Sequence, residues 1–294
     1  MSYTLVLGDI AYSSWSLRAW LLFEKFNIPR TTQYVSFANE KSVAEQMPEM
    51  SPANTVPTIK TPDGAIVGDS LAIAEELASR HPDLDIWPSD PKARATARFL
   101  AAEMHSGFAA LRTACPMSLR QAYDWSSPDD AVRADLARIE SLWAHAREIC
   151  QPEGPWLCGD YSAVDAFFAP VAARIAGFSL PVSAAAQAYV DAHLADPEFR
   201  RWRAMGLVKG ATLERYKQTH PVVDWPGPKP IVAQATARQD SENATCPYSG
   251  KAPTDFLELD DGRVFGFCNA FCRDKTVADP EAWPKFMAIA FPNQ

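Results

Sequence analysis

The first third of the chain alternates short apolar runs with amphipathic stretches. Residues 3–8 form an apolar, β-branched run closed by glycine, which predicts a strand. Residues 16–26 place apolar side chains three to four positions apart, which predicts a helix that ends before Pro29. Residues 31–37 again favour a strand. Because a helical crossover joins parallel neighbours, we expect the two strands to pair in parallel.

A hairpin and a second helix complete this block. Residues 56–60 and 65–68 are strand-like, and the Asp-Gly pair between them is a strong signal for a tight turn. Residues 70–80 have helical periodicity. The order strand, helix, strand and then strand, strand, helix predicts an α/β domain of thioredoxin-like pattern over residues 1–82.

The chain changes character after a proline-containing stretch at residues 82–91. Helical periodicity recurs in four further segments, and no strand is expected before about residue 230; the segments are residues 92–104, 128–150, 162–176 and 184–193. This pattern predicts a second, all-helical domain over residues 90–216. Proline, glycine and polar residues then dominate residues 217–245, which predicts an extended linker.

A third, small α+β module is predicted over residues 246–294. Three of the six cysteines of the chain lie in it. Six cysteines in 294 residues are too few for a disulfide scaffold, so the clustering of three of them calls for its own explanation.

Composition and charge narrow the classes of partner. A chain of 294 residues with 47% hydrophobic residues can bury a sizeable core. The formal net charge of -8 disfavours nucleic acid and anionic membranes, because those surfaces attract basic patches. The first residues lack the features of a signal peptide, and no segment approaches the ~20 apolar residues of a membrane span. We therefore expect a cytoplasmic protein with a small-molecule or protein partner.

The candidate chemistry lies where loops enter helices. Ser13 and Ser14 precede the first predicted helix, where hydroxyls and free N–H groups would stabilise an anion such as a thiolate. The alternative is that these serines only cap the helix. A cis bond between Val56 and Pro57 would leave the Val56 N–H and C=O free to pair with an extended peptide, whereas a trans proline at a strand start is the alternative.

A second helix start carries a similar pair. Asp69 and Ser70 open the helix predicted over residues 70–80. The Ser70 hydroxyl and nearby N–H groups would bind a carboxylate, and Asp69 would accept a hydrogen bond from an ammonium group. The alternative is an ordinary capping pair.

Together these motifs resemble the cytosolic glutathione transferases over residues 1 to about 215. The resemblance rests on four segments in the right order: residues 13–18 are similar to the zeta-class serine signature, 55–57 to the cis-proline motif, 69–73 to the γ-glutamyl-binding motif, and 159–165 to a buried helix-capping box. It implies a homodimer in which the α/β domain of one chain lies against the helical domain of the other.

The resemblance also implies site residues. Ser13, with Ser14 as the runner-up, would donate to the glutathione sulfur and favour its thiolate. Val56 would hold the cysteinyl backbone of glutathione, and the full set of implied glutathione-binding residues is Thr55, Val56, Pro57, Asp69 and Ser70. The implied activity is a glutathione transferase in which the thiolate attacks a small hydrophobic electrophile.

Two departures from the zeta pattern favour conjugation over the isomerase activity of that class. Trp15 replaces a cysteine of the signature and Trp20 replaces its second arginine. A glutathione-dependent isomerase of zeta type is the alternative that these departures disfavour, and a non-catalytic glutathione-binding protein is the other. Trp15, His105 and Arg112 are the candidate electrophile pocket, with Arg112 binding a carboxylate. A helix-packing His105 and a solvated Arg112 are the alternatives.

The C-terminal module resembles small metal modules of the YHS or TRASH type. Cys246, Cys268 and Cys272 are the candidate zinc ligands, with water or a nearby side chain as the fourth. Ser249 stands at the second position of the family's Cys-x-x-Cys, and a hydroxyl is a poor zinc ligand beside thiolates. The alternative is a vestigial module held by its aromatic core. A bound zinc would be structural rather than catalytic.

Overall fold

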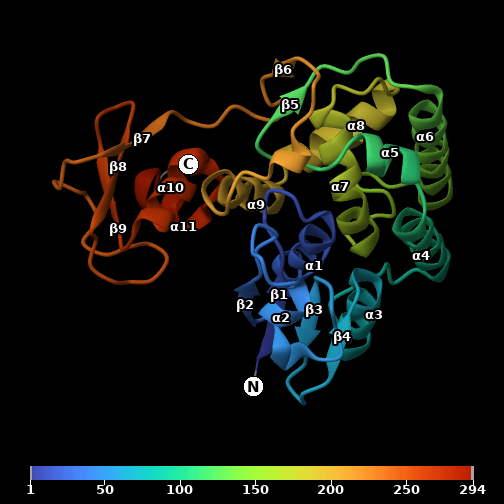
Figure 1. The fold of residues 1–294 in the computed structure, drawn as a ribbon, viewed down its shortest axis with the longest axis horizontal. Helices are drawn as coiled ribbons and strands as arrows, with labels where there is room; N and C mark the ends of the chain where they lie inside the picture. The colour runs from blue at the N-terminus through green and yellow to red at the C-terminus, as the bar shows by residue number, and fades with distance from the viewer. Residues whose placement is uncertain (1, 293–294) are drawn as a thin grey trace. The chain divides into compact units, whose positions relative to one another are not determined.

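The computed structural model describes residues 2–292 of the chain (Figure 1). These residues divide into two compact units. Unit 1 comprises residues 2–194 and 211–226, and unit 2 comprises residues 195–210 and 227–292. Across the described residues, no helix is long and apolar enough to cross a membrane.

Unit 1 begins with a four-stranded mixed sheet and its helices (Figure 1). In chain order the elements are β1 (Tyr3–Leu7), α1 (Ser14–Lys25), β2 (Arg30–Tyr34), α2 (Val43–Gln46), the 3-10 turn η1 (Pro48–Met50), β3 (Thr58–Lys60), β4 (Ile66–Gly68) and α3 (Ser70–Arg80). The strand order is β2-β1-β3-β4, with β1 parallel to β2 and β3 antiparallel to both of its neighbours. The predicted parallel pair and the predicted hairpin are therefore confirmed.

Alternation along β1 explains how the sheet is buried. Val6 packs in a cluster with Val35, Met47 and Met50 on one face. The neighbouring Leu5 and Leu7 point to the opposite face, because successive strand residues alternate, and both are fully buried. The sheet thus has apolar cover on both faces.

The rest of unit 1 is mainly helical. Its elements are α4 (Pro91–Ser106), α5 (Ala109–Ala114), β5 (Ala122–Tyr123), α6 (Asp130–Cys150), α7 (Ala163–Gly177), α8 (Ala184–Ala195), η2 (Glu214–Tyr216) and β6 (Val222–Val223). Every residue of α7 is buried, and this helix contacts both α1 and α4. The short strands β5 and β6 pair in antiparallel fashion, so the expectation of no strand before about residue 230 is wrong.

The Asp165 half of the predicted capping box at the start of α7 is present in unit 1. Asp165 accepts hydrogen bonds from the N–H of Ser162 at 3.0 Å and of Leu157 at 3.1 Å. The Tyr189 hydroxyl donates to the same carboxylate at 2.8 Å. Burial raises the pKa of Asp165 to about 6, against the opposing effect of these donors.

Unit 2 contains a helix and a small α+β module. Its elements are α9 (Pro197–Val208), β7 (Ala233–Thr236), β8 (Asp255–Leu259), β9 (Val264–Phe267), α10 (Ala270–Ala278), η3 (Pro280–Ala282) and α11 (Pro284–Ala290). The strands form an antiparallel sheet in the order β7-β8-β9, and α9 packs against α10 and η3. Phe265 and Phe286 meet edge to face at 5.2 Å in its core.

The three-part fold class is confirmed: a thioredoxin-like α/β part, a helical part and a small α+β tail. The domain boundaries at residues 82, 90, 216 and 246 stay sequence predictions. Helix α9, within predicted domain 90–216, belongs to unit 2, and β7 lies within the predicted linker 217–245.

Candidate functional site

Ser13 ties the start of α1 to the end of β1. As the N-cap residue, it accepts a hydrogen bond from the Ser16 N–H at 3.3 Å, and its hydroxyl donates to the Ser16 oxygen at 2.7 Å. Ser16 in turn accepts from the Gly8 N–H at 2.9 Å. This network fixes the loop between strand and helix, so the free N–H groups of α1 have a defined direction.

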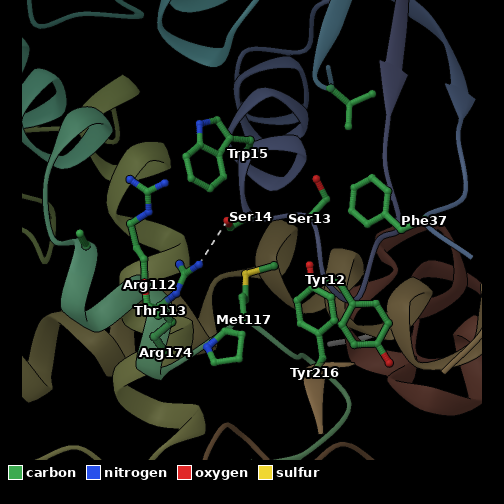
Figure 2. A pocket seen from close by; sticks show the side chains of 13 residues that line it. Tyr12, Ser13, Ser14, Trp15, Phe37, Arg112, Thr113, Met117, Arg174 and Tyr216 are labelled. Carbon is green, nitrogen blue, oxygen red and sulfur yellow. Dashed lines mark hydrogen bonds between the residues drawn. The ribbon is translucent and has the colours of Figure 1, made fainter. Parts of the chain in front are cut away.

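Ser14, the first residue of α1, has a different environment. A buried arginine of α7, Arg174, donates to the Ser14 oxygen at 3.3 Å (Figure 2). Arg174 also donates to the carbonyls of Cys115 at 2.9 Å and Pro170 at 3.2 Å. Burial, with the nearby Arg112, lowers the pKa of Arg174 to about 10, so it stays positively charged at neutral pH. The Ser14 proton remains available to donate to a ligand.

Both serines line a cavity of about 490 Å³ in unit 1 (Figure 2). Aromatic, cationic and small side chains share its walls, which are formed by Tyr12, Ser13, Ser14, Trp15, Phe37, Val56, Ala109, Arg112, Thr113, Pro116, Met117, Arg174 and Tyr216. Figure 2 shows Trp15 and Arg112 on one side and Phe37, Tyr12 and Tyr216 on the other. Of the predicted electrophile pocket, the structure brings Trp15 and Arg112 to the serines.

Positive charge gathers around Trp15. The guanidinium carbon of Arg112 lies 4.3 Å from the centroid of the Trp15 ring, and that of Arg18 lies 4.8 Å from it. Burial, together with the positive charges of Arg174 and Arg112, lowers the pKa of the fully buried Arg18 to about 9. Three arginines near one cavity favour a ligand that carries negative charge.

The Val56–Pro57 bond is cis, as one reading of the sequence expects. Val56 lines the cavity, and within residues 2–292 its N–H and C=O form no hydrogen bond. The Thr55 carbonyl accepts from the Thr58 hydroxyl at 2.7 Å. The backbone of Val56 is therefore free to pair with an extended peptide. A second cis bond, Ser51–Pro52, has no counterpart in the sequence analysis.

Asp69 and Ser70 lie at the start of α3, outside the lining of the cavity. One oxygen of Asp69 accepts from the N–H groups of Leu71 at 2.7 Å and Ala72 at 3.3 Å. The Ser70 hydroxyl is buried and has no hydrogen-bond partner in the described part of the chain. A buried hydroxyl without a partner is costly, and a polar ligand group would satisfy it.

His105 is placed beside Asp69 and does not line the cavity. Its Nε2 is 3.2 Å from the other Asp69 oxygen, and its Nδ1 is 3.5 Å from a guanidinium nitrogen of Arg18. Burial lowers the pKa of His105, and the charge of Asp69 opposes that effect. The structure therefore groups His105 with the predicted glutathione residues rather than with the predicted electrophile pocket.

The sequence analysis missed several residues that line the cavity. Arg174 has a recognisable signal, because it is the lone basic residue of helix α7, which is apolar after Asp165 apart from this arginine. Tyr12 and Tyr216 have none: their rings lie 4.6 Å apart although about 200 positions separate them in sequence. Only the folded chain shows that η2 completes the wall beside the first loop.

The three predicted metal ligands meet in unit 2. The sulfur atoms of Cys246, Cys268 and Cys272 all lie within 4.8 Å of one another. Cys246 is buried, which raises its pKa, but hydrogen bonds from the N–H groups of Cys268, Tyr248 and Ser249 outweigh burial and lower it to about 7. Burial raises the pKa of Cys272 to about 12, and Lys275 opposes this.

The first domain has a recognised class. Residues 12–80 match the family model described as "Glutathione S-transferase, N-terminal domain". A crystal structure of a glutathione transferase homolog from Burkholderia gl BGR1, with bound glutathione, is similar at a TM-score of 0.52 and 22% identity. The match covers 70% of this chain and 98% of that chain. Unit 1 therefore has the glutathione transferase fold, and residues 12–80 are similar to the N-terminal domain of that family.

Two curated relatives have names that specify an activity. The probable maleylacetoacetate isomerase of Caenorhabditis elegans is 35% identical over 94 residues, 32% of this chain and 42% of that protein. The maleylacetoacetate isomerase of Dictyostelium discoideum is 27% identical over 125 residues, 42% of this chain and 55% of that protein. The chain thus spans about half the length of the curated relatives it matches.

Proposed function

We propose that unit 1 is a glutathione transferase. The observation that carries the proposal is that Ser13 and Ser14, at the N-terminus of α1, share one cavity with the free backbone of Val56. A peptide paired with Val56 would present its thiol to the serine pair. Thr55 and Pro57 flank that backbone, and Asp69 with Ser70 offers a carboxylate and an unsatisfied hydroxyl to the γ-glutamyl end of glutathione.

The chemistry requires a thiolate. A free thiol has a pKa of roughly 8.5, so only a few per cent is nucleophilic near neutral pH. A hydroxyl donor, the N-terminus of α1 and the charge of Arg174 all stabilise the anion, so the thiol releases its proton to solvent. The sulfur electron pair then forms a bond to the electrophilic carbon, and the bond to the leaving group breaks with its electron pair.

The two serines can be separated by titration of bound glutathione. We expect thiolate absorbance of the bound tripeptide to show a lowered pKa in the wild type. Ser13→Ala disturbs the cap of α1, whereas Ser14→Ala removes the hydroxyl next to Arg174. The variant that returns the thiol pKa toward its free value identifies the donor, and Ser79→Ala, at an exposed helical site, is the control. An unshifted pKa in the wild type would favour the non-catalytic glutathione-binding protein.

The walls of the cavity suggest an electrophile that carries a carboxylate as well as an apolar part. Arg112 and Arg174 supply charge, while Trp15, Phe37 and Met117 supply apolar contact. Arg112→Met should raise KM for acceptors with a carboxylate far more than for neutral acceptors of similar size. Equal effects on both acceptor types would exclude carboxylate binding by Arg112.

A glutathione-dependent isomerase is the second candidate function. Two curated relatives are named as such isomerases, and the cationic cavity suits an anionic substrate. In that reaction the thiolate adds to a carbon–carbon double bond, the resulting single bond rotates, and elimination restores the double bond and the thiolate. Incubation of the protein with glutathione and a carboxylate-bearing cis alkene distinguishes the two functions. Net consumption of glutathione indicates conjugation, whereas conversion to the trans alkene without consumption indicates isomerisation.

We propose further that unit 2 binds zinc through Cys246, Cys268 and Cys272. Their sulfur atoms are close enough to share one ion, and thiolates are preferred zinc ligands. Zinc would stabilise the fold of a small module and supply no chemistry to the cavity. Metal analysis of the purified chain and of Cys246→Ser tests this proposal. Because the three cysteines form one cluster, we expect about one zinc ion per wild-type chain and a much lower zinc content in the variant.

Assembly and location complete the proposal. The family resemblance supports a homodimer that pairs the α/β domain of one chain with the helical domain of the other, in the cytoplasm. Sedimentation equilibrium measures the oligomeric state directly, and a mass equal to one chain of 32.4 kDa at micromolar concentration would exclude a stable dimer.

A further inference from the structure

Lys275 of α10 is a buried cation in an aromatic enclosure. Only 9% of the surface of Lys275 is exposed to solvent. The ammonium nitrogen lies 3.9 Å from the centroid of the Trp283 ring and 4.0 Å from that of Tyr248. Cation–π attraction holds the ammonium there, but the rings carry no net charge to balance it. A buried charge is costly unless an opposite charge accompanies it.

The cysteine cluster is the source of opposite charge that faces Lys275. Among the residues of the described chain, no carboxylate forms an ion pair with its ammonium. The groups that interact with it electrostatically are Cys272, Cys246 and Cys268, together with Arg201, which has the same sign as the lysine. Burial lowers the pKa of Lys275, and negative charge on the cluster would oppose that effect and compensate the buried ammonium.

We propose that Lys275 is the counter-charge of a three-thiolate divalent metal centre whose fourth coordination position opens to solvent beside Ser249. The inference rests on the proposed zinc function and deepens it. Three thiolates and one divalent ion carry a net charge of minus one, which the ammonium neutralises. A neutral ligand at the fourth position keeps the balance, whereas a fourth thiolate would leave an uncompensated negative charge in a largely buried site.

Ser249 marks the position of the neutral ligand. It stands at the second position of a Cys-x-x-Cys pattern and is exposed. Its hydroxyl oxygen accepts a hydrogen bond from the Lys251 N–H at 3.3 Å. A hydroxyl is a poor zinc ligand beside thiolates and the residue lies at the surface, so a water molecule would complete the coordination. Zinc sites with an open position exchange that ligand, unlike closed four-residue sites.

The charge balance predicts the effect of removing the ammonium. The full-length chain is stripped of metal and titrated with zinc in competition with a chromogenic chelator. Lys275→Met should weaken zinc binding by about 10- to 100-fold, the range typical of residues that support metal ligands from outside the coordination shell. Lys285→Met removes the same charge from an exposed position of α11 in unit 2 and should leave the affinity unchanged. If Lys275→Met does not fold, Lys275→Gln, a polar and uncharged replacement, takes its place.

Cobalt reports the ligands independently of affinity. In the wild type, Co²⁺ should give the intense visible bands of a tetrahedral site and sulfur charge-transfer absorption from three thiolates. Ser249→Cys should increase the charge-transfer absorption, because it adds a thiolate at the open position, and should make zinc binding more sensitive to Lys275→Met. An unchanged spectrum in Ser249→Cys, or equal affinity in Lys275→Met and wild type, overturns the inference. A wild-type chain that binds neither metal overturns the zinc proposal itself.

Discussion

Two arginine–carboxylate pairs with matched geometry differ in burial, and this difference predicts their contributions to stability. Arg200 of α9 bonds both oxygens of Asp279 at 2.8 and 2.7 Å, and its side chain and that of Asp279 are 16% and 10% exposed. Arg138 of α6 bonds both oxygens of Glu103 at 2.7 and 2.8 Å, with 49% and 26% exposed. The same substitution, arginine to methionine, therefore compares a buried with an exposed bidentate pair. At Arg200 it also removes a longer contact to Glu281, at 3.3 Å.

The expected magnitudes follow from the distances and the exposure. A unit charge pair at 2.7 Å is worth about 6 kcal/mol at an effective permittivity near 20, and about 1.5 kcal/mol in bulk water. Loss of one partner of a buried pair costs about 3–5 kcal/mol, because the other charge stays buried. Since Arg200 keeps some solvent contact, we expect Arg200→Met to cost about 3 kcal/mol, near the lower end of that range. Arg138→Met should cost far less, because solvent screens the charges of this exposed pair.

Urea unfolding measures both costs. The two units are expected to unfold in separate transitions, so circular dichroism is combined with the reactivity of the buried Cys246, which reports unit 2. Arg200→Met should lower the midpoint of the transition that exposes Cys246, and Arg138→Met should affect only the other transition. Equal losses in the two variants, or an unchanged unit 2 transition in Arg200→Met, would refute the argument from burial.

Three further predictions concern unit 1. A Cβ on Gly8 would approach a Phe37 ring carbon at 2.8 Å and a Val56 methyl at 3.0 Å, so Gly8→Ala should weaken glutathione binding, as measured by calorimetry, and destabilise the chain by about 1–3 kcal/mol. Burial lowers the pKa of His193 to about 3 from roughly 6.5 in the unfolded chain. The folded state thus binds fewer protons, stability falls as the pH decreases from about 6.5 toward 3, and His193→Gln should flatten that dependence in urea titrations. Ser70→Ala should weaken glutathione binding without loss of thermal stability, since the Ser70 hydroxyl is buried without a partner; a fall in Tm with unchanged affinity would contradict its role.

Local signals account for what the sequence predicts well in the first domain. Asp69 and Arg80 bound the predicted second helix because a capping side chain and a terminal basic residue mark its ends, and α3 has those bounds. The Asp63-Gly64 turn likewise places the β3–β4 hairpin. The first helix begins two residues earlier than predicted, because the Ser13 cap includes Ser14 in the first turn.

Non-local pairing accounts for what the sequence does not show. Strands β5 and β6 are two residues long and about 100 positions apart, too short for any periodicity to be detected. Helix α9 has charged residues on much of its surface, and its partners, α10 and η3, follow it by more than 60 residues. Such elements are specified by tertiary contacts rather than by local propensity.

The candidate site likewise combines local motifs with contacts between residues far apart in the sequence. Three features can be predicted from the sequence because each is a short motif with fixed spacing: the serine pair, the cis bond at Val56–Pro57 and the cysteine cluster. The partners of these motifs cannot be identified from the sequence: Arg174 donates to Ser14 across 160 positions, and the rings that enclose Lys275 come from Tyr248, before α10, and Trp283, after it. Sequence indicates the reactive groups, whereas their electrostatic environment comes from packing.

The interleaved connectivity of the two units has a practical consequence for fragment design. The chain enters unit 2 at residue 195, returns to unit 1 for residues 211–226, and then enters unit 2 again. A cut after residue 226 would remove the β7-β8-β9 sheet and α10 but retain α9, which has the buried side chains of Phe199 and Trp202 and contacts α10 and η3. Exposure of each large apolar side chain costs about 1.5–3 kcal/mol of hydrophobic stabilisation, and an exposed apolar patch promotes aggregation. A fragment that keeps unit 1 alone should therefore also lack α9, with a linker that joins residues 194 and 211.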